Sequence, residues 1–256
     1  MSEAMIGQIH RDPHLWEFRA GRLTCQLLGD YPHGFGSSST YPLFPQELVQ
    51  QWWQGDQDQA VWAEQVHGNQ VVQAEDPHRD PQADALYTQE PGVSVWVSTA
   101  DCVPILLAGP GVVAAIHAGW RGTAAQITPK VITHFTETLA ISPSQLVMAI
   151  GPCISRAAYQ VSQDVAAQVL ATLPLSTHSQ VSQPDPQPGK VKLDLALTNA
   201  YQALAAGVCT IAISPYCTYT HPEQFFSYRR LGSLKIRDQP SRVQWSGIAL
   251  PSPPAP

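Results

Sequence analysis

Two histidines and one cysteine, His67, Cys102 and His117, are the residues of this chain whose types and surroundings best suit metal chemistry. Each stands beside small or turn-forming residues at the end of an apolar run. Two imidazoles and a thiolate suit zinc, and three protein ligands leave a fourth position open, as in catalytic rather than structural zinc sites. The alternative is that the histidines are hydrogen-bonded core residues and the cysteine is a buried apolar thiol.

The spacing of Cys102 and His117 around a turn signal indicates that the two side chains lie close together. If two strands pair symmetrically about Gly109-Pro110, opposite residues have numbers that sum to 219, as those of Cys102 and His117 do. Opposite Cβ atoms are about 5 Å apart, which suits two ligands of one ion. Pro110 cannot take the positive φ of a two-residue type I′ loop, so this loop must be longer or distorted. Pro104 suggests an edge strand or a bulge beside the site.

Hydrophobic periodicity predicts the strands and helices that position these residues. Alternating valines predict a strand over Val93–Val97 that runs towards Cys102. An apolar stripe every four residues predicts a helix over Ile127–Leu139, with Pro129 either at a kink or in a first turn capped by Thr128. Strands and helices do not alternate regularly, which favours an α+β fold over a doubly wound sheet. Further strands are expected over 105–108, 112–116, 146–150 and 210–214, and further helices over 162–172, capped by Ser162, and 195–206.

The composition excludes several classes of protein. Hydrophobic residues make up 44% of the 256 and charged residues only 13%, which is typical of a globular chain. The net charge of −6 and the absence of a Lys/Arg cluster argue against nucleic acid and favour small-molecule partners. The chain contains no run of about 18 apolar residues, so no membrane span is predicted. The N-terminus does not resemble a secretory signal, and five scattered cysteines fit a reducing cytoplasm. We expect one domain over 1–250 and a disordered, Pro-rich tail over 251–256.

At the candidate ligands the sequence resembles the laccase-domain family, whose members are described as multicopper polyphenol oxidoreductases and as zinc-dependent purine nucleoside phosphorylases. The match runs in order from about Val61 to Arg230, and its Thr-Ala-Asp-Cys and His-Ala-Gly-Trp-Arg-Gly segments are long and unusual. The matching segments are Gln65–Gly68, Ser98–Leu107, Ala115–Thr123, Ile150–Ile154, Leu193–Leu195, Cys217–Thr218 and Phe225–Arg230.

The resemblance implies a single α-β-β-α layered domain with mixed sheets, and zinc bound by His67, Cys102 and His117. It also implies phosphorolysis of adenosine, inosine, guanosine and methylthioadenosine, with adenosine deamination as a second activity. Purine nucleosides and inorganic phosphate would be the partners. Two segments depart from the family pattern: no arginine follows His33 near the N-terminus, and 231–235 replaces the usual Thr-Gly-Arg after the double arginine.

A phosphorolytic enzyme must also hold phosphate, and the planar fork of arginine suits this task. Arg121 lies four residues after His117, and Arg229 follows an aromatic run. Both are candidate site residues, with surface charges or ion-pair partners as the alternative. Tyr228 is a candidate to stack on a purine, although aromatic residues in apolar runs are more often core. His33 is a candidate substrate contact because it aligns with the N-terminal histidine of the family.

Other functions compete with phosphorolysis. A copper-dependent polyphenol oxidase needs ligands for several ions, commonly in His-x-His pairs, and the chain has no His-x-His. A metal-free cysteine hydrolase could use Cys102 as the nucleophile, with His117 or His67 as its base. A non-enzymatic binding or assembly factor is a further possibility. Asp101, next to Cys102, could order the ligands, cap a turn, or act as an acid or base.

Overall fold

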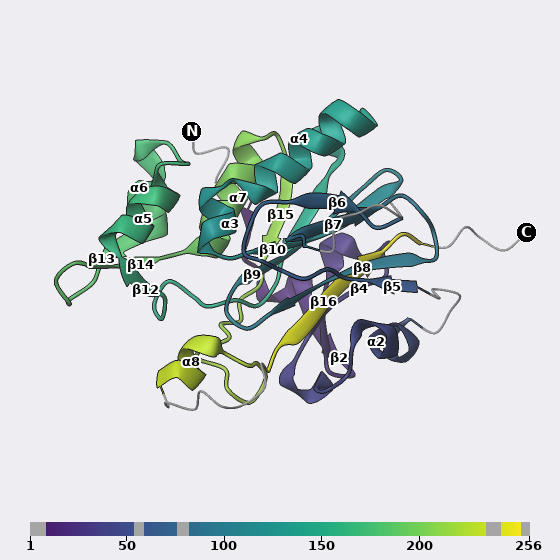
Figure 1. The fold of residues 1–256 in the computed structure, drawn as a ribbon, viewed down its shortest axis with the longest axis horizontal. Helices are drawn as coiled ribbons and strands as arrows, with labels where there is room; N and C mark the ends of the chain where they lie inside the picture. The colour runs from purple at the N-terminus through teal and green to yellow at the C-terminus, as the bar shows by residue number, and fades with distance from the viewer. Residues whose placement is uncertain (1–8, 54–58, 76–81, 234–241, 252–256) are drawn as a thin grey trace, which may run out of the picture.

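The computed structural model describes residues 9–53, 59–75, 82–233 and 242–251, and two large sheets pack face to face within them (Figure 1). The larger sheet is mixed: its pairs are parallel at both edges and antiparallel in the middle. From edge to edge its strands are β1 (Ile9–His10), β15 (Thr210–Ile213), β11 (Val147–Ile150), β9 (Val103–Gly109), β10 (Val112–Ala118), β7 (Ala85–Thr88) and β6 (Val71–Gln73).

The hairpin of β9 and β10 forms the apolar centre of this sheet, because every residue of both strands is buried. Gly109 pairs with Val112, so Pro110 and Gly111 form a two-residue turn. Gly111 has a φ of 69°, and proline followed by a positive-φ glycine suits a type II turn. The turn predicted at Gly109-Pro110 is therefore wrong by one residue. Proline fits the first central position, and the positive φ falls on glycine.

The second sheet is mainly antiparallel, with only β5 running parallel to its neighbour β8. The alternation of β8 places Val95 and Val97 in the core shared with the larger sheet, and Trp96 on the opposite face. There Trp96 packs under α2 (Pro45–Trp52), with its ring centroid 5.6 Å from that of Trp52. From edge to edge the strands are β2 (Trp16–Arg19), β3 (Arg22–Cys25), β4 (His33–Gly36), β16 (Gln244–Ala249), β8 (Val93–Thr99) and β5 (Gln59–Val61).

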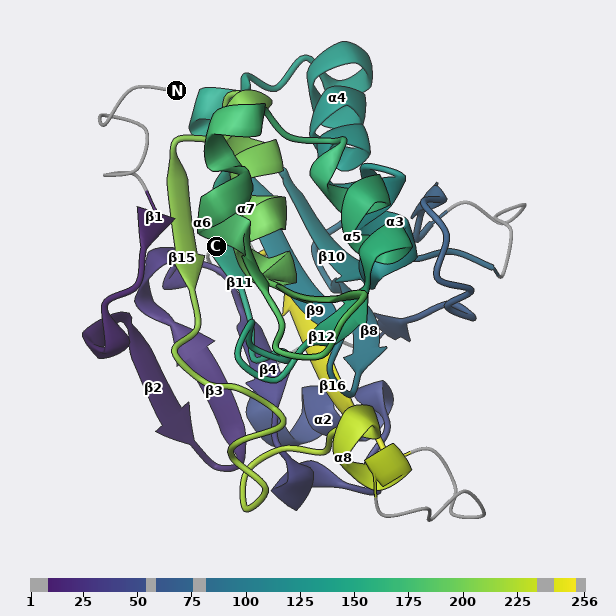
Figure 2. The same ribbon diagram turned by 90° about the vertical axis from the view of Figure 1, so that its left-hand side faces the viewer.

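Helices cover the outer faces of both sheets, which gives the layer order α-β-β-α (Figure 2). Phe135 and Leu204 belong to helices that pack on the seven-stranded sheet, in one core with Ile105 and Ile116. The other outer face carries α2. The predicted α+β fold with layered, mixed sheets is therefore confirmed. The remaining helices are α3 (Trp120–Ala124), α4 (Ile127–Leu139), α5 (Gln163–Leu170), α6 (His178–Val181), α7 (Leu195–Ala205) and α8 (Tyr228–Ser233).

The N-terminus of α5 has the predicted side-chain cap, whereas that of α4 does not. Ser162 caps α5 as expected, since its hydroxyl accepts a hydrogen bond from the Val165 N–H at 3.3 Å. Thr128, however, lies inside α4 and donates its hydroxyl to Asn199 Oδ1 at 2.7 Å. The N-cap of α4 is Gln126, and Pro129 stands in the first turn, where the lack of an N–H costs nothing.

A small antiparallel sheet extends from the side of the fold that carries α5 and α6 (Figure 1). No helix among the described ranges is long and apolar enough to cross a membrane. The Pro-rich tail predicted over 251–256 lies, except for its first residue, outside the described residues. The strands of the small sheet, in spatial order, are β12 (Gln160–Ser162), β14 (Lys190–Leu193) and β13 (Ser182–Pro184).

Candidate metal centre

The structure brings His67, Cys102 and His117 together where β9 begins and β10 ends. The imidazole nitrogens available as ligands and Cys102 Sγ all lie within 4.8 Å of one another. The rings of the two histidines meet nearly edge to face, with centroids 4.8 Å apart. His117 is buried, Cys102 is partly exposed and His67 is exposed, so the cluster is open to solvent on the His67 side.

Cys102 and His117 are diagonal neighbours rather than direct partners. His117 is the penultimate residue of β10 and pairs with Pro104, while Cys102 directly precedes β9. The predicted direct opposition is wrong by two positions, since the hairpin turn is centred one residue later than expected. Diagonal neighbours remain within reach of each other, so the two ligands still meet. The predicted edge strand is also wrong: β9 is central, and Pro104 lies near its start, beyond the last residue that pairs with β11.

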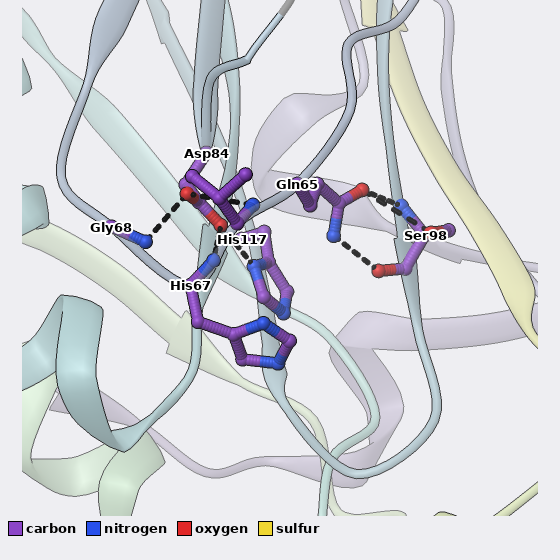
Figure 3. A network of polar contacts seen from close by, with 7 residues as sticks. Gln65, His67, Gly68, Asp84, Ser98 and His117 are labelled. Carbon is purple, nitrogen blue, oxygen red and sulfur yellow. Dashed lines mark hydrogen bonds and ion pairs between the residues drawn. The ribbon is translucent and has the colours of Figure 1, made fainter.

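A buried carboxylate that sequence reasoning missed, Asp84, holds both histidine segments in place (Figure 3). Its Oδ1 accepts a hydrogen bond from His117 Nδ1 at 2.7 Å. The carboxylate also accepts the backbone N–H groups of His67 at 3.0 Å and Gly68 at 2.6 Å. Because Nδ1 of His117 is committed to Asp84, Nε2 is the nitrogen left for a metal. A carboxylate behind a ligating histidine is the usual arrangement in zinc sites. The only sequence signal for Asp84 is an acidic residue before an apolar strand, which is weak.

The loop that carries His67 is held from two sides. His67 has a φ of 60°, in the left-handed region that non-glycine residues seldom adopt, and the N–H bonds to Asp84 stabilise this conformation. Two residues earlier, Gln65 binds the backbone of Ser98 in both directions (Figure 3). Gln65 Nε2 donates to the Ser98 carbonyl at 2.8 Å, and Gln65 Oε1 accepts the Ser98 N–H at 2.7 Å. The loop is therefore tied to β8, the strand that leads to Cys102.

These contacts favour the charged forms of Cys102 and His117 when no metal is bound. Burial would raise the pKa of the Cys102 thiol, but hydrogen bonds from His117 and His67 outweigh burial and lower the pKa to about 7. Burial also opposes the protonated His117 ring, but hydrogen bonds to Asp84 and Cys102 raise its pKa to about 9. The thiolate is thus substantially populated near neutral pH, and a cation that binds here would take the place of the His117 proton.

Two glycines allow the first turn of α3 to approach this cluster. A Cβ on Gly119 would lie 3.1 Å from His67 Cδ2 and 3.2 Å from Cys102 Sγ. A Cβ on Gly122 would lie 2.9 Å from the Gly68 carbonyl oxygen. These distances are tighter than ordinary contacts, so a side chain at either position would push α3 away from the ligands.

Asp101 turns the chain into Cys102 and anchors a distant segment beside it. Its φ is 104° and its side chain is buried. The carboxylate accepts hydrogen bonds from the Thr218 hydroxyl at 2.6 Å, the Ser227 hydroxyl at 3.0 Å and the Arg229 N–H at 2.7 Å. Burial raises the pKa of Asp101, and these three bonds act in the opposite direction. Of the roles that the sequence left open for Asp101, the contacts favour the ordering of neighbouring segments.

The predicted substrate-binding residues lie on segments around the cluster. Arg121 is exposed in α3, with its guanidinium carbon 4.5 Å from the ring centroid of Trp120. Arg229 is partly buried, and its guanidinium carbon lies 5.3 Å from the ring centroid of Tyr159. Tyr228 is 77% exposed at the start of α8. Arg121 and Arg229 thus lie on two segments, far apart in the sequence, that adjoin the cluster: Gly119 of the first lies against His67 and Cys102, and the Arg229 N–H of the second binds Asp101.

His33, by contrast, is not brought to the cluster. Its Nε2 accepts the Cys25 N–H at 2.8 Å, and its Nδ1 donates to the Tyr31 carbonyl at 2.7 Å, so both ring nitrogens bind the backbone of the segment that leads from β3 to β4. His33 pairs with the fifth residue of β16, whereas the cluster lies beyond the first, about 13 Å further along the strand. The contacts assign His33 a structural role, and they give no support to the predicted substrate contact.

The donor set fits a zinc ion. Zn–N bonds of about 2.0–2.1 Å and Zn–S bonds of about 2.3 Å place tetrahedral ligands roughly 3.5 Å apart, so only small movements are needed. The cluster supplies two imidazoles and a thiolate and leaves one coordination position for water or substrate. Within the described ranges it is the only group of three or more His, Cys, Asp or Glu side chains with this spacing.

The sequence and the fold both have known relatives. Residues 45–235 match the family described as multi-copper polyphenol oxidoreductase laccase. The chain is 37% identical to a purine nucleoside phosphorylase of Synechocystis over 88% of this chain and 92% of that protein. It is 38% identical to a purine nucleoside phosphorylase of Geobacillus stearothermophilus over 66% of each. The crystal structure of YlmD from Geobacillus stearothermophilus has a similar fold, with a TM-score of 0.80 and 28% identity over 93% of this chain and 99% of that one. The chain therefore belongs to the multi-copper polyphenol oxidoreductase laccase family, with relatives named purine nucleoside phosphorylases.

Proposed function

We propose that this protein is a zinc-dependent purine nucleoside phosphorylase. The observation that carries the proposal is the cluster of His67, Cys102 and His117, which offers three ligands and is open to solvent, with Arg121 and Arg229 on segments that adjoin it. Relatives that align with 88% and 66% of the chain bear the name of this activity. The five cysteines are all free thiols, which fits an enzyme of a reducing cytoplasm.

Zinc is the metal that this ligand set favours over copper. A multicopper oxidase needs ligand sets for several ions, and the described part of the chain supplies one such set. Two imidazoles, one thiolate and a free position match catalytic zinc sites. When bound, the ion would supply Lewis-acid chemistry to a substrate placed beside it.

The chain's own side chains would hold and orient the two substrates. In phosphorolysis, a phosphate oxygen forms a bond to the anomeric carbon of the ribose. The glycosidic C–N bond breaks, and the departing purine keeps the electron pair and takes a proton. Arg121 and Arg229 supply the positive charge for phosphate, and the exposed ring of Tyr228 is available to stack on the purine. The proposed nucleosides are adenosine, inosine, guanosine and methylthioadenosine, with adenosine deamination as a second activity.

Metal analysis beside a purine-release assay tests this proposal. We expect about one zinc per chain, and release of free base from inosine only when inorganic phosphate is added. A chelator should abolish release, and added zinc should restore it. Cys102→Ala should lose zinc and activity while circular dichroism stays unchanged, whereas Cys209→Ala, at an exposed cysteine, should retain both. Undiminished zinc in Cys102→Ala, or base release that does not depend on phosphate, would contradict the assignment.

A specific observation also supports a second candidate, a metal-free cysteine hydrolase. Cys102, His117 and Asp84 are linked in the order nucleophile, base and orienting carboxylate. A nucleophilic Cys102 would remain active without metal and would be inactivated rapidly by iodoacetamide. In the zinc enzyme the thiolate is committed to the ion, so metal-free protein should be inactive and zinc should protect Cys102 from labelling. Full activity in verified metal-free protein would favour the hydrolase.

A further inference from the structure

Tyr159 lies against one of the two arginines of the proposed phosphate site. It precedes β12 and is partly buried. The Arg229 guanidinium carbon is 5.3 Å from the Tyr159 ring centroid, within the range of a cation–π contact. Arg229 Nη1 also approaches the carbonyl of the preceding residue, Ala158, at 3.5 Å. The guanidinium is therefore held by the ring and by the adjacent backbone.

Backbone hydrogen bonds hold both partners of this contact. The Tyr159 N–H donates to the Ser155 carbonyl at 3.0 Å, and the Tyr159 carbonyl accepts the Leu193 N–H at 3.1 Å. The Arg229 N–H donates to Asp101, whose neighbour in the chain is Cys102. The Arg229 side chain thus has an anchored backbone and a fixed surface to lie on, which restricts a long side chain that would otherwise sample many rotamers.

The charges of Cys102, Asp101, Arg229 and Arg121 all act on the Tyr159 hydroxyl. Burial and the negative charges of Cys102 and Asp101 raise the pKa of the Tyr159 hydroxyl well above its usual range. The positive charges of Arg229 and Arg121 act in the opposite direction. The phenol stays neutral at physiological pH, so Tyr159 can serve as a surface for a cation but does not compete with an anionic substrate.

We propose that Tyr159 is a positioning residue whose ring holds the Arg229 guanidinium beside the His67–Cys102–His117 cluster, where that guanidinium binds the phosphate co-substrate. This proposal rests on the proposed function. It assigns the effect to the aromatic face of Tyr159 and not to its hydroxyl. A fixed guanidinium binds phosphate more tightly because less side-chain entropy is lost when the complex forms.

Two substitutions separate the ring from the hydroxyl. Tyr159→Leu removes the ring and should raise the Michaelis constant for phosphate about fivefold, in line with the strength of a cation–π contact. The Michaelis constant for the nucleoside, the kcat and the zinc content should change less than twofold. Tyr159→Phe keeps the ring and should restore the phosphate constant to within twofold of wild type. Tyr31→Leu, which removes a partly buried tyrosine that binds the Gly109 carbonyl, is the matched control and should leave the phosphate constant unchanged.

A double substitution tests the route through the arginine. If Tyr159 acts by positioning Arg229, the phosphate constant of Tyr159→Leu/Arg229→Ala should equal that of Arg229→Ala alone. Additive effects would overturn the proposal. So would a Tyr159→Phe variant as impaired as Tyr159→Leu, or a Tyr159→Leu variant with an unchanged phosphate constant.

A binding measurement distinguishes failure of this inference from failure of the proposed function. Inorganic phosphate is titrated into the zinc-loaded protein by calorimetry, without nucleoside. Weaker phosphate binding in Tyr159→Leu than in Tyr159→Phe supports the positioning role even if the wild type releases no purine, in which case only the proposed activity fails. Equal phosphate affinity in both variants overturns the positioning role, whatever the activity.

Discussion

Replacing Asp84 with asparagine tests how far a buried carboxylate sets the geometry of the metal ligands. The Asp84 side chain is fully buried and accepts hydrogen bonds from His117 Nδ1 and from the N–H groups of His67 and Gly68. Asparagine has nearly the same shape, but it carries no charge, and one of its two terminal groups is a donor that would face these donors. Loss of a second-sphere carboxylate typically costs about 10–100-fold in metal affinity, and we expect a zinc dissociation constant raised by that factor.

The same substitution should destabilise the metal-free fold. Breaking a buried, charge-assisted network costs about 3 kcal/mol or more, which for a chain of this length lowers the melting temperature by roughly 6–12 °C. Burial tends to raise the pKa of Asp84, but the bonds from His117 and the loop outweigh burial and lower that pKa below its ordinary value of 3.8. The stabilisation that ionised Asp84 gives the fold is therefore complete at pH values above 3.8, and it is lost as the pH falls through the lowered pKa of Asp84. Asp84→Asn should lack this acid-dependent loss.

Chelator competition measures the zinc dissociation constant. Scanning calorimetry between pH 2 and pH 7 measures the stability of the fold over about five pH units, a range that includes the ordinary carboxylate pKa values. Glu137→Gln makes the same chemical change on the exposed face of α4, and it should alter neither quantity beyond about 0.5 kcal/mol. Wild-type zinc affinity in a correctly folded Asp84→Asn protein would refute the reasoning, since it would show that His67 and His117 are oriented without the carboxylate.

Three further outcomes follow from the geometry. Gly119→Ala should weaken zinc binding about tenfold by crowding His67 and Cys102, whereas Gly232→Ala, where a Cβ meets nothing within 4 Å, should leave zinc binding unchanged. Equal zinc dissociation constants for the two variants in a zinc titration would contradict the crowding. Arg121→Ala should raise the Michaelis constant for phosphate about tenfold with zinc content unchanged, and a constant equal to that of wild type would remove Arg121 from the phosphate site. Iodoacetamide should label Cys102 in metal-free protein with a rate that rises around a midpoint of about pH 7, because the thiolate is the reactive form. Peptide mass spectrometry measures this rate, and a midpoint near pH 9 would show that the histidines do not stabilise the thiolate.

Much of the fold around the candidate site could be predicted from local sequence patterns. Strand β8 and helices α4 and α7 have strong hydrophobic periodicity, so their bounds agree with prediction to within two residues. No element was predicted over β2, β3 and β4. Strands β2 and β3 nevertheless form a local hairpin about Ala20 and Gly21, which both have positive φ, and their apolar and polar residues alternate, so this is a local signal that the prediction missed. Strand β4 differs, because it joins this hairpin to β16, which lies far along the chain, and no local window contains that pairing.

The register of the central hairpin could not be predicted from the turn sequence alone. Turn chemistry correctly indicated a hairpin near Pro110, but the centre depended on which residue takes the positive φ. Because the turn is centred one residue later than predicted, Cys102 lies diagonal to His117 rather than directly opposite it. The ligand set survives because diagonal neighbours are still within reach of one another.

The sequence by itself determined the candidate ligand types, because a metal selects its donor atoms by chemistry that is visible in His67, Cys102 and His117. Tertiary structure alone decided which other residues serve them. Asp84 has only a weak local signal, yet it is buried behind His117. Arg229 and Arg230 are adjacent and identical in type, but Arg230 donates to backbone carbonyls of its own segment while Arg229 lies against Tyr159. The physical reason is that ligand type belongs to a single residue, whereas orientation and burial depend on contacts between segments that meet only when the chain is folded.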